Sequence, residues 1–232
     1  MPEGDTIHRA ASRLGRAIGG AELRRIEAPR WAGPLPVVGE TVESVEAVGK
    51  HLHARFSGGL VLATHMRMTG SWHLYRPGER WRKGRSTMRV LVGTDDWDAV
   101  CFSAPDVAFT RAPTGTAHLG PDLCLADADL DECVRRFELV DPSETVAEAL
   151  LDQRVCCGVG NVFKSEVCWA LRLDPFTPVA AIEAALRRSL VETATTQLRA
   201  NLTTTRRTTV PGGLAVYGHT GQPCRRCRTP IR

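Results

Sequence analysis

The stretch DQRVCCGVGNVFKSEVCW, residues 152–169, contains two glycines two positions apart, followed at once by an asparagine. Gly158 and Gly160 predict a tight turn, and Asn161 stands where a helix N-cap residue belongs. The pattern predicts two helices joined by a turn, the second over residues 161–171. The start of such a helix presents free N–H groups and a positive dipole end, which can hold a phosphate. A capped helical hairpin without a ligand is the alternative.

Apolar residues at helical spacing predict further helices on both sides of this stretch, over residues 145–151 and 182–202. The longer one has an apolar residue at every fourth position, which is typical of a surface that faces a core. A similar pattern predicts a helix over residues 7–18, ended by Gly19-Gly20.

Between residues 22 and 111 the pattern changes to short β-rich runs separated by turn residues. This spacing is typical of an antiparallel sandwich or barrel. The β part gives way to the helical part near residues 125–140, and a short β element is expected to begin at Val216-Tyr217. The predicted strands cover residues 41–48, 52–56, 60–64, 88–92, 100–102 and 107–109.

Composition indicates a globular chain without a membrane segment. The 232 residues are 43% hydrophobic and 24% charged, and no apolar run approaches the roughly 18–20 residues that a membrane span needs. The N-terminus has no apolar stretch of the signal-peptide type, so a cytoplasmic protein is expected. The eight cysteines are then expected to be reduced thiols or metal ligands.

Charge is segregated along the chain, although the net charge is only +4. Residues 193–232 contain seven arginines and no acid, residues 76–89 contain six basic residues and one acid, and residues 127–148 contain eight acids and two arginines. This segregation indicates a face that binds a polyanion and a solvated opposite face. Arginine-rich loops without a ligand are the alternative.

The chain begins MPEG, which has two interpretations. Pro and Glu suit the first turn of a helix. Alternatively, removal of Met1 leaves Pro2 as a secondary amine beside Glu3. An α-amino group has a reference pKa of roughly 8, so part of it is unprotonated and nucleophilic near neutral pH.

Taken together, MPEG and the Gly-Val-Gly-Asn turn resemble the Fpg/Nei family of DNA glycosylases. The resemblance runs from residue 2 to the last residue with the motifs in family order. It implies an α+β fold with an N-terminal antiparallel β-sandwich domain that carries an N-terminal helix (1–125), a helix–two-turn–helix domain (126–213) and a partial zinc-finger segment (214–232). The other matching segments are GKHL (49–52), HMRMTGSW (65–72), HLGPDL (118–123) and VYGHTGQPCRRC (216–227).

The resemblance implies a bifunctional DNA glycosylase and apurinic/apyrimidinic lyase in base excision repair. Pro2 would attack C1′ of a damaged nucleotide and form an iminium ion, and strand cleavage by elimination would follow. Glu3 would move protons at the sugar, and Lys50 resembles the family's lysine that contacts phosphate. Glu166 matches a helical acid near the family's catalytic centre, although a buried ion pair is equally plausible.

An enzyme that extrudes a base from a duplex must fill the gap left behind. Arg67, Met68 and Thr69 match the family's void-filling positions, and a methionine suits a wedge between base steps. A core methionine in a hairpin is the alternative. The resemblance also assigns DNA or phosphate contacts to His65, His118 and Asn161.

Two segments favour the Nei branch, which prefers oxidised pyrimidines. The chain has Gly4-Asp5-Thr6 and the loop 103–109 where the Fpg branch carries different motifs. The alternatives are an Fpg-type enzyme for oxidised purines such as 8-oxoguanine, and a non-catalytic protein of the same fold that binds damaged DNA. The expected partner is damaged DNA, without a membrane or a nucleotide cofactor, and the expected state is a monomer.

The family's zinc finger is represented by a single Cys-x2-Cys pair, Cys224 and Cys227. A structural zinc site needs four ligands, usually from two such pairs. The sequence therefore predicts an incomplete site in which zinc is weakly bound or absent. His219 is a weak candidate for a third ligand.

Overall fold

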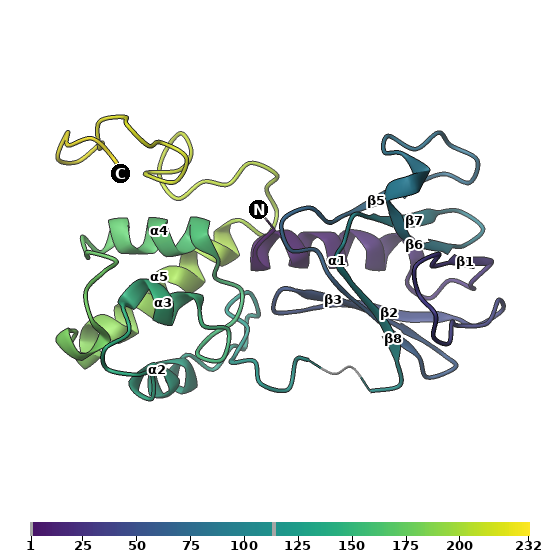
Figure 1. Cartoon of the computed structure of the whole chain (residues 1–232), viewed down its shortest axis with the longest axis horizontal. Helices are drawn as coiled ribbons and strands as arrows, with labels where there is room; N and C mark the ends of the chain where they lie inside the picture. The colour runs from purple at the N-terminus through teal and green to yellow at the C-terminus, as the bar shows by residue number, and fades with distance from the viewer. Residues whose placement is uncertain (1, 113–114) are drawn as a thin grey trace. The chain divides into compact units, whose positions relative to one another are not determined.

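The computed structural model describes residues 2–112 and 115–232, so the predicted removal of Met1 concerns a residue outside the described range. The chain divides into two compact units (Figure 1). The first contains Pro2 and Thr6–Ala117, and the second contains Glu3–Asp5 and His118–Arg232.

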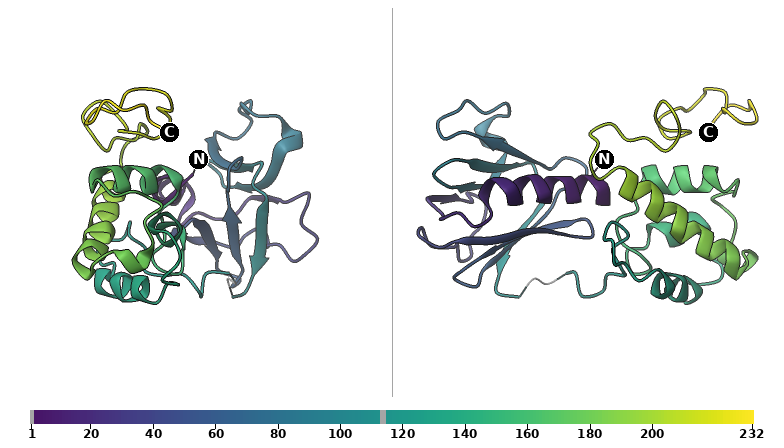
Figure 2. Two further views of the ribbon diagram at one scale, coloured as in Figure 1. Left: turned by 60° about the vertical axis from the view of Figure 1, so that its left-hand side comes forward. Right: turned by 180° about the vertical axis from the view of Figure 1, so that it is seen from behind.

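The first unit contains two four-stranded sheets in which every strand pair is antiparallel (Figure 2). One sheet has the strand order β1-β6-β7-β5 and the other β2-β3-β4-β8. The predicted β-sandwich with an N-terminal helix is confirmed. The elements are α1 (Gly4–Ile18), β1 (Arg25–Glu27), β2 (Val42–Val48), β3 (His51–Phe56), β4 (Val61–His65), β5 (Ser71–Tyr75), η1 (Arg85–Thr87), β6 (Met88–Gly93), β7 (Asp98–Phe102) and β8 (Asp106–Thr110).

Helix α1 supplies one wall of the main core of this unit. Ile7, Ala11, Leu14 and Ile18 recur at helical spacing and are buried together with side chains from both sheets. A second, smaller core forms on strands β5, β6 and β7, where Trp81 packs against Tyr75, Phe102 and their neighbours. The segment between β5 and β6 is thereby anchored to the sheet.

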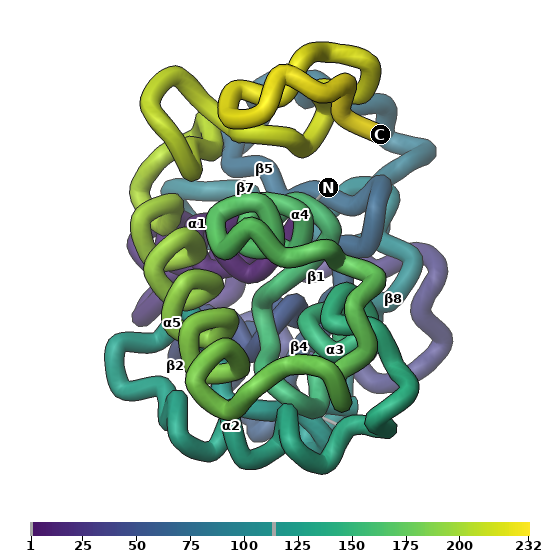
Figure 3. Tube along the Cα trace, turned by 90° about the vertical axis from the view of Figure 1, so that its left-hand side faces the viewer, coloured from purple at the N-terminus to yellow at the C-terminus, as the bar shows by residue number. Residues whose placement is uncertain are grey.

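The second unit is helical (Figure 3). It contains α2 (Leu130–Glu138), α3 (Val146–Leu151), α4 (Asn161–Ala170), η2 (Val179–Ala181) and α5 (Ala184–Ala200). Asp129 caps α2, and Thr145 forms a capping box with Glu148 at the start of α3. The predicted apolar stripe of α5 is confirmed as core, because Leu190, Ala194 and Leu198 are fully buried.

Several local predictions were wrong. The sequence pattern missed α2, β1 and β5, and it started α1 three residues late. Asn161 is the first residue of α4 and Gly160 is the N-cap, so the cap has no side-chain oxygen of its own. Residues Val216-Tyr217 form turn structure rather than a β element.

None of the helices in the described ranges is both long and apolar enough to cross a membrane.

Candidate active site

Glu3 is fully buried in the second unit, where it fills the N-terminus of α4. Its Oε2 accepts hydrogen bonds from the backbone N–H groups of Gly160 at 3.0 Å and Phe163 at 3.3 Å, and its Oε1 accepts one from Val162 at 2.8 Å. The carboxylate therefore does what an N-cap side chain does in other helices. Glu3, which directly follows the predicted nucleophile Pro2, is thereby fixed in position.

This contact changes the expectation of a free phosphate site at the start of α4. Three of the N–H groups that would hold a phosphate are already occupied by Glu3. The side chain of Asn161 is exposed, and its Oδ1 accepts a hydrogen bond from Lys164 Nζ at 3.3 Å. The start of α4 is therefore not the open phosphate site that the sequence predicted.

The Gly-Val-Gly sequence is required by close packing. Gly158 has φ = 108°, a conformation that favours glycine. A Cβ at Gly160 would lie only 2.5 Å from the carboxyl carbon of Glu3. The backbone N–H of Gly4 also donates to the carbonyl of Gly158 at 2.8 Å. The turn is thus shaped to receive Glu3 and Gly4.

Asp5, the second buried acid of this short segment, forms a bidentate ion pair with Arg207. Arg207 Nη2 lies 2.6 Å from Asp5 Oδ1, and Nε lies 2.8 Å from Oδ2. Burial opposes the charge of Arg207, but the hydrogen bonds that Arg207 donates to Asp5, together with the negative charges of Asp5 and Glu3, outweigh burial and raise the pKa of Arg207. The pair fixes the segment after α5 to residues Glu3–Asp5.

Glu166 on α4 organises the loop Thr209–Tyr217. Its carboxylate is fully buried. It accepts hydrogen bonds from the backbone N–H groups of Ala215 at 2.7 Å, Val216 at 2.8 Å and Tyr217 at 2.9 Å, and from the hydroxyl of Thr209. Within the described residues Glu166 forms no ion pair, so the buried-pair alternative for this acid is wrong.

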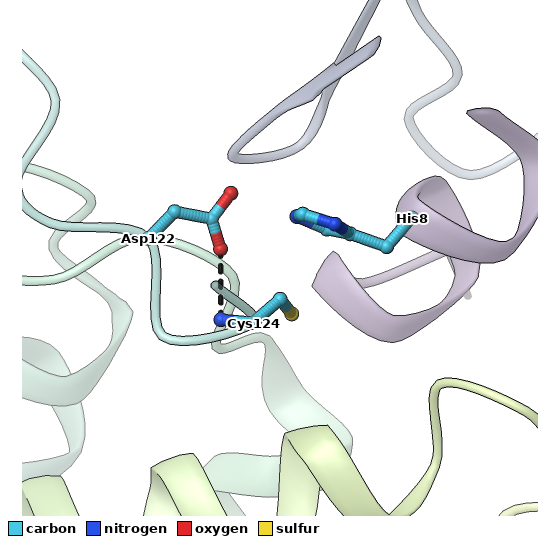
Figure 4. A group of neighbouring side chains, drawn as sticks. All are labelled: His8, Asp122 and Cys124. Atoms are coloured by element: carbon cyan, nitrogen blue, oxygen red, sulfur yellow. Dashed lines mark hydrogen bonds between the residues drawn. The ribbon is translucent and has the colours of Figure 1, made fainter. Parts of the chain in front are cut away.

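A further turn of the second unit lies at residues 122–124. Asp122 Oδ1 accepts a hydrogen bond from the backbone N–H of Cys124 at 2.9 Å (Figure 4). The third side chain in that view, His8, belongs to the first unit. His118 lies at the start of the second unit and is exposed; its charge is one of the smaller contributions that lower the pKa of Asp152, after the hydrogen bond from Arg154.

In the first unit, Pro2 and Lys50 are both half-buried. Lys50 lies in the turn between β2 and β3, directly before His51 and not on a strand. His51 pairs with His65 across strands β3 and β4. The charge of Lys50 is one of several that act on the ring of His65.

His65 and His51 form a stacked pair with ring centroids 4.6 Å apart. The pKa of both rings is lowered, and burial is the main cause. For His51 the lowered pKa is about 4, with smaller contributions from the charges of His65 and His53. Both rings are therefore neutral near pH 7. His65 Nδ1 lies 3.4 Å from Asp106 Oδ2, so Asp106 orients the ring that the resemblance assigns to DNA.

The turn after β4 presents the three predicted void-filling residues. Arg67, Met68 and Thr69 are all exposed, with 69% of the Met68 surface accessible. The alternative of a core methionine is wrong for Met68. Asp106 holds Arg67 through a 2.6 Å contact to Nε, and the Thr69 hydroxyl donates to the carbonyl of Ser103 at 2.9 Å.

The residues Cys224 and Cys227 provide chemistry suited to half of a zinc site. The pKa of the Cys224 thiol is lowered to about 6, because N–H groups donate to its sulfur and favour the thiolate. The backbone N–H of Cys227 contributes most, followed by the indole N–H of Trp169. Among the described residues, however, no group of three neighbouring His, Cys, Asp or Glu ligand atoms includes either cysteine. The ring of His219 is hydrogen-bonded to Gln222 at 2.9 Å. These residues therefore do not complete a tetrahedral site.

Sequence reasoning missed three contributors to this arrangement: Asp106, the Asp5–Arg207 pair and the loop partners of Glu166. Asp106 is the first residue of β8 and lies in the segment 103–109 that favoured the Nei branch, which was the available signal. The other two depend on contacts between residues distant in sequence, which no local pattern reveals.

Two family models match the chain. The formamidopyrimidine-DNA glycosylase N-terminal domain matches residues 1–106, and the formamidopyrimidine-DNA glycosylase H2TH domain matches residues 119–210.

Curated relatives align over the whole chain. A probable endonuclease 8 2 from Streptomyces coelicolor is 41% identical and aligns over 100% of this chain and 87% of its own length. The DNA-(apurinic or apyrimidinic site) lyase Nei2 of Mycolicibacterium smegmatis is 35% identical over 100% of this chain and 92% of its own length. A formamidopyrimidine-DNA glycosylase from Acidothermus cellulolyticus is 32% identical over 100% of this chain and 90% of its own length.

Solved structures share the fold. The MutM (Fpg) protein of Thermus thermophilus has a TM-score of 0.79 at 24% identity, covering 99% of this chain and 92% of that chain. The Lactococcus lactis Fpg in complex with abasic-site DNA has a TM-score of 0.81 at 19% identity, covering 99% of this chain and 93% of that chain.

Proposed function

Because the chain belongs to the Fpg/Nei family of DNA glycosylases, we propose that it is a bifunctional glycosylase and apurinic/apyrimidinic lyase of base excision repair. The observation that carries this proposal is the burial of Glu3 at the N-terminus of α4. Three N–H donors fix the backbone directly after Pro2, as a covalent reaction at an N-terminal amine requires.

The proposed reaction begins with the secondary amine of processed Pro2. Its lone pair attacks C1′ of the damaged nucleotide, the bond from C1′ to the base breaks, and the base leaves with the proton of the amine. The bond from C1′ to O4′ then breaks as O4′ takes a proton, for which Glu3 is the proposed source, and the nitrogen lone pair forms the double bond to C1′. The resulting iminium ion acidifies the C2′ proton. Loss of that proton expels the 3′ phosphate in the β-elimination, and a second elimination expels the 5′ phosphate. Glu3 and Lys50 are the proposed groups for proton movement and phosphate contact.

The proposed DNA contacts come from both units. Arg67, Met68 and Thr69 are proposed to fill the gap left by the extruded base, because they are exposed together on one turn. His65, His118 and Asn161 are proposed to contact the backbone. We propose that the protein acts as a monomer without a nucleotide cofactor.

The functional parts are proposed as 1–125, 126–213 and 214–232. Cys224 and Cys227 are the residues proposed to hold zinc, which would supply a structural cross-link and no step of the reaction. Two ligands alone make that site weak.

The preferred substrates are proposed to be oxidised pyrimidines. The support is the higher identity to relatives named endonuclease 8 2 or Nei2, 35–41%, than to those named formamidopyrimidine-DNA glycosylase, 26–32%. Oxidised purines are the second candidate. Parallel assays on duplexes with thymine glycol or 8-oxoguanine distinguish the two.

The test of the chemistry is borohydride trapping on a duplex with an abasic site. Processed wild-type protein should give a covalent adduct, whereas Pro2→Gly and a form that retains Met1 should give at least about 100-fold less. Equal trapping by these forms would show that Pro2 is not the nucleophile. Binding without trapping by the wild type would favour a non-catalytic DNA-binding protein.

A further inference from the structure

The basic segment Arg76–Arg89 connects β5 to β6, and its role is not explained by the proposed active site. The segment is held firmly at one point of the first unit. The Trp81 ring packs edge-on against Phe102 with centroids 5.6 Å apart, and the backbone N–H of Arg82 donates to the hydroxyl of Tyr75 at 3.1 Å. The next residue, Lys83, therefore has a defined position over β5.

Lys83 reaches back to the start of β5. Its Nζ donates to Ser71 Oγ at 2.8 Å, and the same oxygen lies 3.1 Å from His73 Nε2. Ser71 and His73 are two residues apart on the strand, so both side chains lie on the same face of it. An ammonium group has three N–H donors, and this serine uses one of them.

Three cations act on this group, and none of them has an ion-pair partner among the described residues. These cations are Arg13, Arg82 and Lys83. The pKa of His73 is lowered, first by burial and then by the charges of Lys83, Arg13 and Arg82. Two carboxylates line the same pocket as Lys83, but both have other partners: Glu79 accepts from the backbone N–H of Arg76, and Asp98 pairs with Arg25.

Three other cations of the same segment already have partners. Arg85 pairs with Glu27 at 2.7 Å, and Arg76 stacks on Trp97 at 3.9 Å while donating to the carbonyl of Asp96. Arg89 donates to the carbonyl of Pro105 at 3.4 Å. Within the described residues Arg80 also has no ion pair, whereas the Lys83 ammonium is held at Ser71 by its hydrogen bond, so Ser71 is the place where an anion would meet a positioned cation of this segment.

The position of Ser71 in the chain indicates which kind of anion would bind beside Lys83. Ser71 follows the Arg67–Thr69 turn after one glycine, so the cluster lies beside the residues proposed to enter the duplex. We propose that Lys83, with Ser71, Arg82 and Arg13, forms a binding site for a backbone phosphate of the DNA that the Arg67–Thr69 turn engages. This inference rests on the proposed function. Lys83 and the Ser71 hydroxyl supply hydrogen bonds, and the two arginines supply charge.

The test compares Lys83→Ala with Arg85→Ala in the full chain. Both variants remove one positive charge from the same segment, but Arg85 is neutralised by Glu27. Affinity for a labelled duplex with an abasic-site analogue is measured by fluorescence anisotropy between about 50 and 200 mM salt. Lys83→Ala should weaken binding about 3–10-fold at the lowest salt and reduce the slope of log K against log salt by about one.

Arg85→Ala should leave that slope nearly unchanged, and Lys83→Arg should restore most of the affinity lost in Lys83→Ala. The inference is overturned if both alanine variants change the slope equally or if Lys83→Ala changes nothing. Circular dichroism melting of each variant identifies a loss of folding. If Lys83→Ala unfolds, Lys83→Met, which keeps the apolar stem, replaces it in the same comparison.

A second arm separates a DNA phosphate from a free anion. Inorganic phosphate is titrated into the wild type while the intrinsic fluorescence of its five tryptophans, Trp81 among them, is followed. Tight phosphate binding with an unchanged DNA salt slope in Lys83→Ala would overturn the proposal. Strand cleavage of the abasic duplex by wild type tests the proposed function separately, because it requires Pro2 and does not require Lys83. Cleavage by wild type with no Lys83 effect refutes only this inference.

Discussion

At the scale of single residues, two buried carboxylates of the second unit use backbone N–H groups as partners. Glu3 accepts three such bonds and Glu166 accepts three together with one from a hydroxyl. Removing a charged acceptor from a buried set of donors leaves them unsatisfied, which is costly. Each carboxylate therefore fixes a stretch of backbone: Glu3 the entry to α4, and Glu166 the loop Thr209–Tyr217.

We expect Glu166→Gln to destabilise the protein by about 2–3 kcal/mol, because its amide NH₂ would face N–H donors. Chemical denaturation measures this change. Limited proteolysis should show faster cutting within residues 209–217. The matched control is Glu192→Gln on α5, where an exposed carboxylate has only a 3.6 Å contact with Arg188; its effect should stay below about 0.5 kcal/mol. Equal effects of the two changes would contradict this role for Glu166.

At the scale of elements, the turn Arg67–Thr69 and the strand after it combine exposure with rigid support. Gly70 is buried, and a Cβ there would come within 2.7 Å of the Met66 backbone, so the turn closes only with glycine. The Thr69 bond to Ser103 and the Arg67 contact with Asp106 brace the turn from β8 and its preceding loop. Met68 is left to protrude.

We expect Met68→Ala to slow base excision from duplex DNA about 10-fold while leaving stability within about 0.5 kcal/mol, because the side chain is exposed. Single-turnover assays on duplex, abasic and single-stranded substrates measure this. The loss should be much smaller on the last two, where less unstacking is required. Met66→Ala is the contrasting change. Because Met66 is buried, this substitution should cost about 2–5 kcal/mol of stability. An equal loss for Met68→Ala on all three substrates would indicate a folding role.

The sequence predicted most elements, and the failures have physical causes. Helix α2 has apolar residues at Leu130, Cys133, Val134 and Phe137, a helical spacing that the acidic composition of the segment obscured. Strand β5 begins inside the segment 65–72, which was matched to the family as a single motif, so its strand pattern was not considered separately. Asn161 lost the N-cap position because Glu3, remote in sequence, supplies the capping carboxylate. For the candidate site, motifs predicted the identities of residues, but the partners of Glu3, Asp5 and Glu166 depend on tertiary contacts.

At the scale of the whole molecule, each unit has its own core, and the proposed chemistry draws on residues of both. The first unit contains Pro2, Lys50 and the Arg67–Thr69 turn, and the second contains Glu3 and Asn161. The segment that contains Cys224 and Cys227 belongs to the second unit, where Arg226 stacks on Trp169 at 4.1 Å and donates to its carbonyl at 2.8 Å. These contacts attach the cysteine pair to α4 without requiring a metal.

We therefore expect the 232-residue chain to hold zinc weakly and to fold without it. Two thiolates leave a tetrahedral ion with half its ligands, whereas the main apolar clusters of both units include neither Cys224 nor Cys227. Elemental analysis after gel filtration should give well under one zinc per chain, and a chelator should leave the thermal unfolding midpoint unchanged within about 1 °C. Cys224→Ser is the matched test, because it removes a ligand while keeping a small polar side chain. One tightly held zinc per chain, lost in Cys224→Ser, would show that other residues complete the site. Trapping at Pro2 should survive chelation, because zinc takes no part in the proposed reaction.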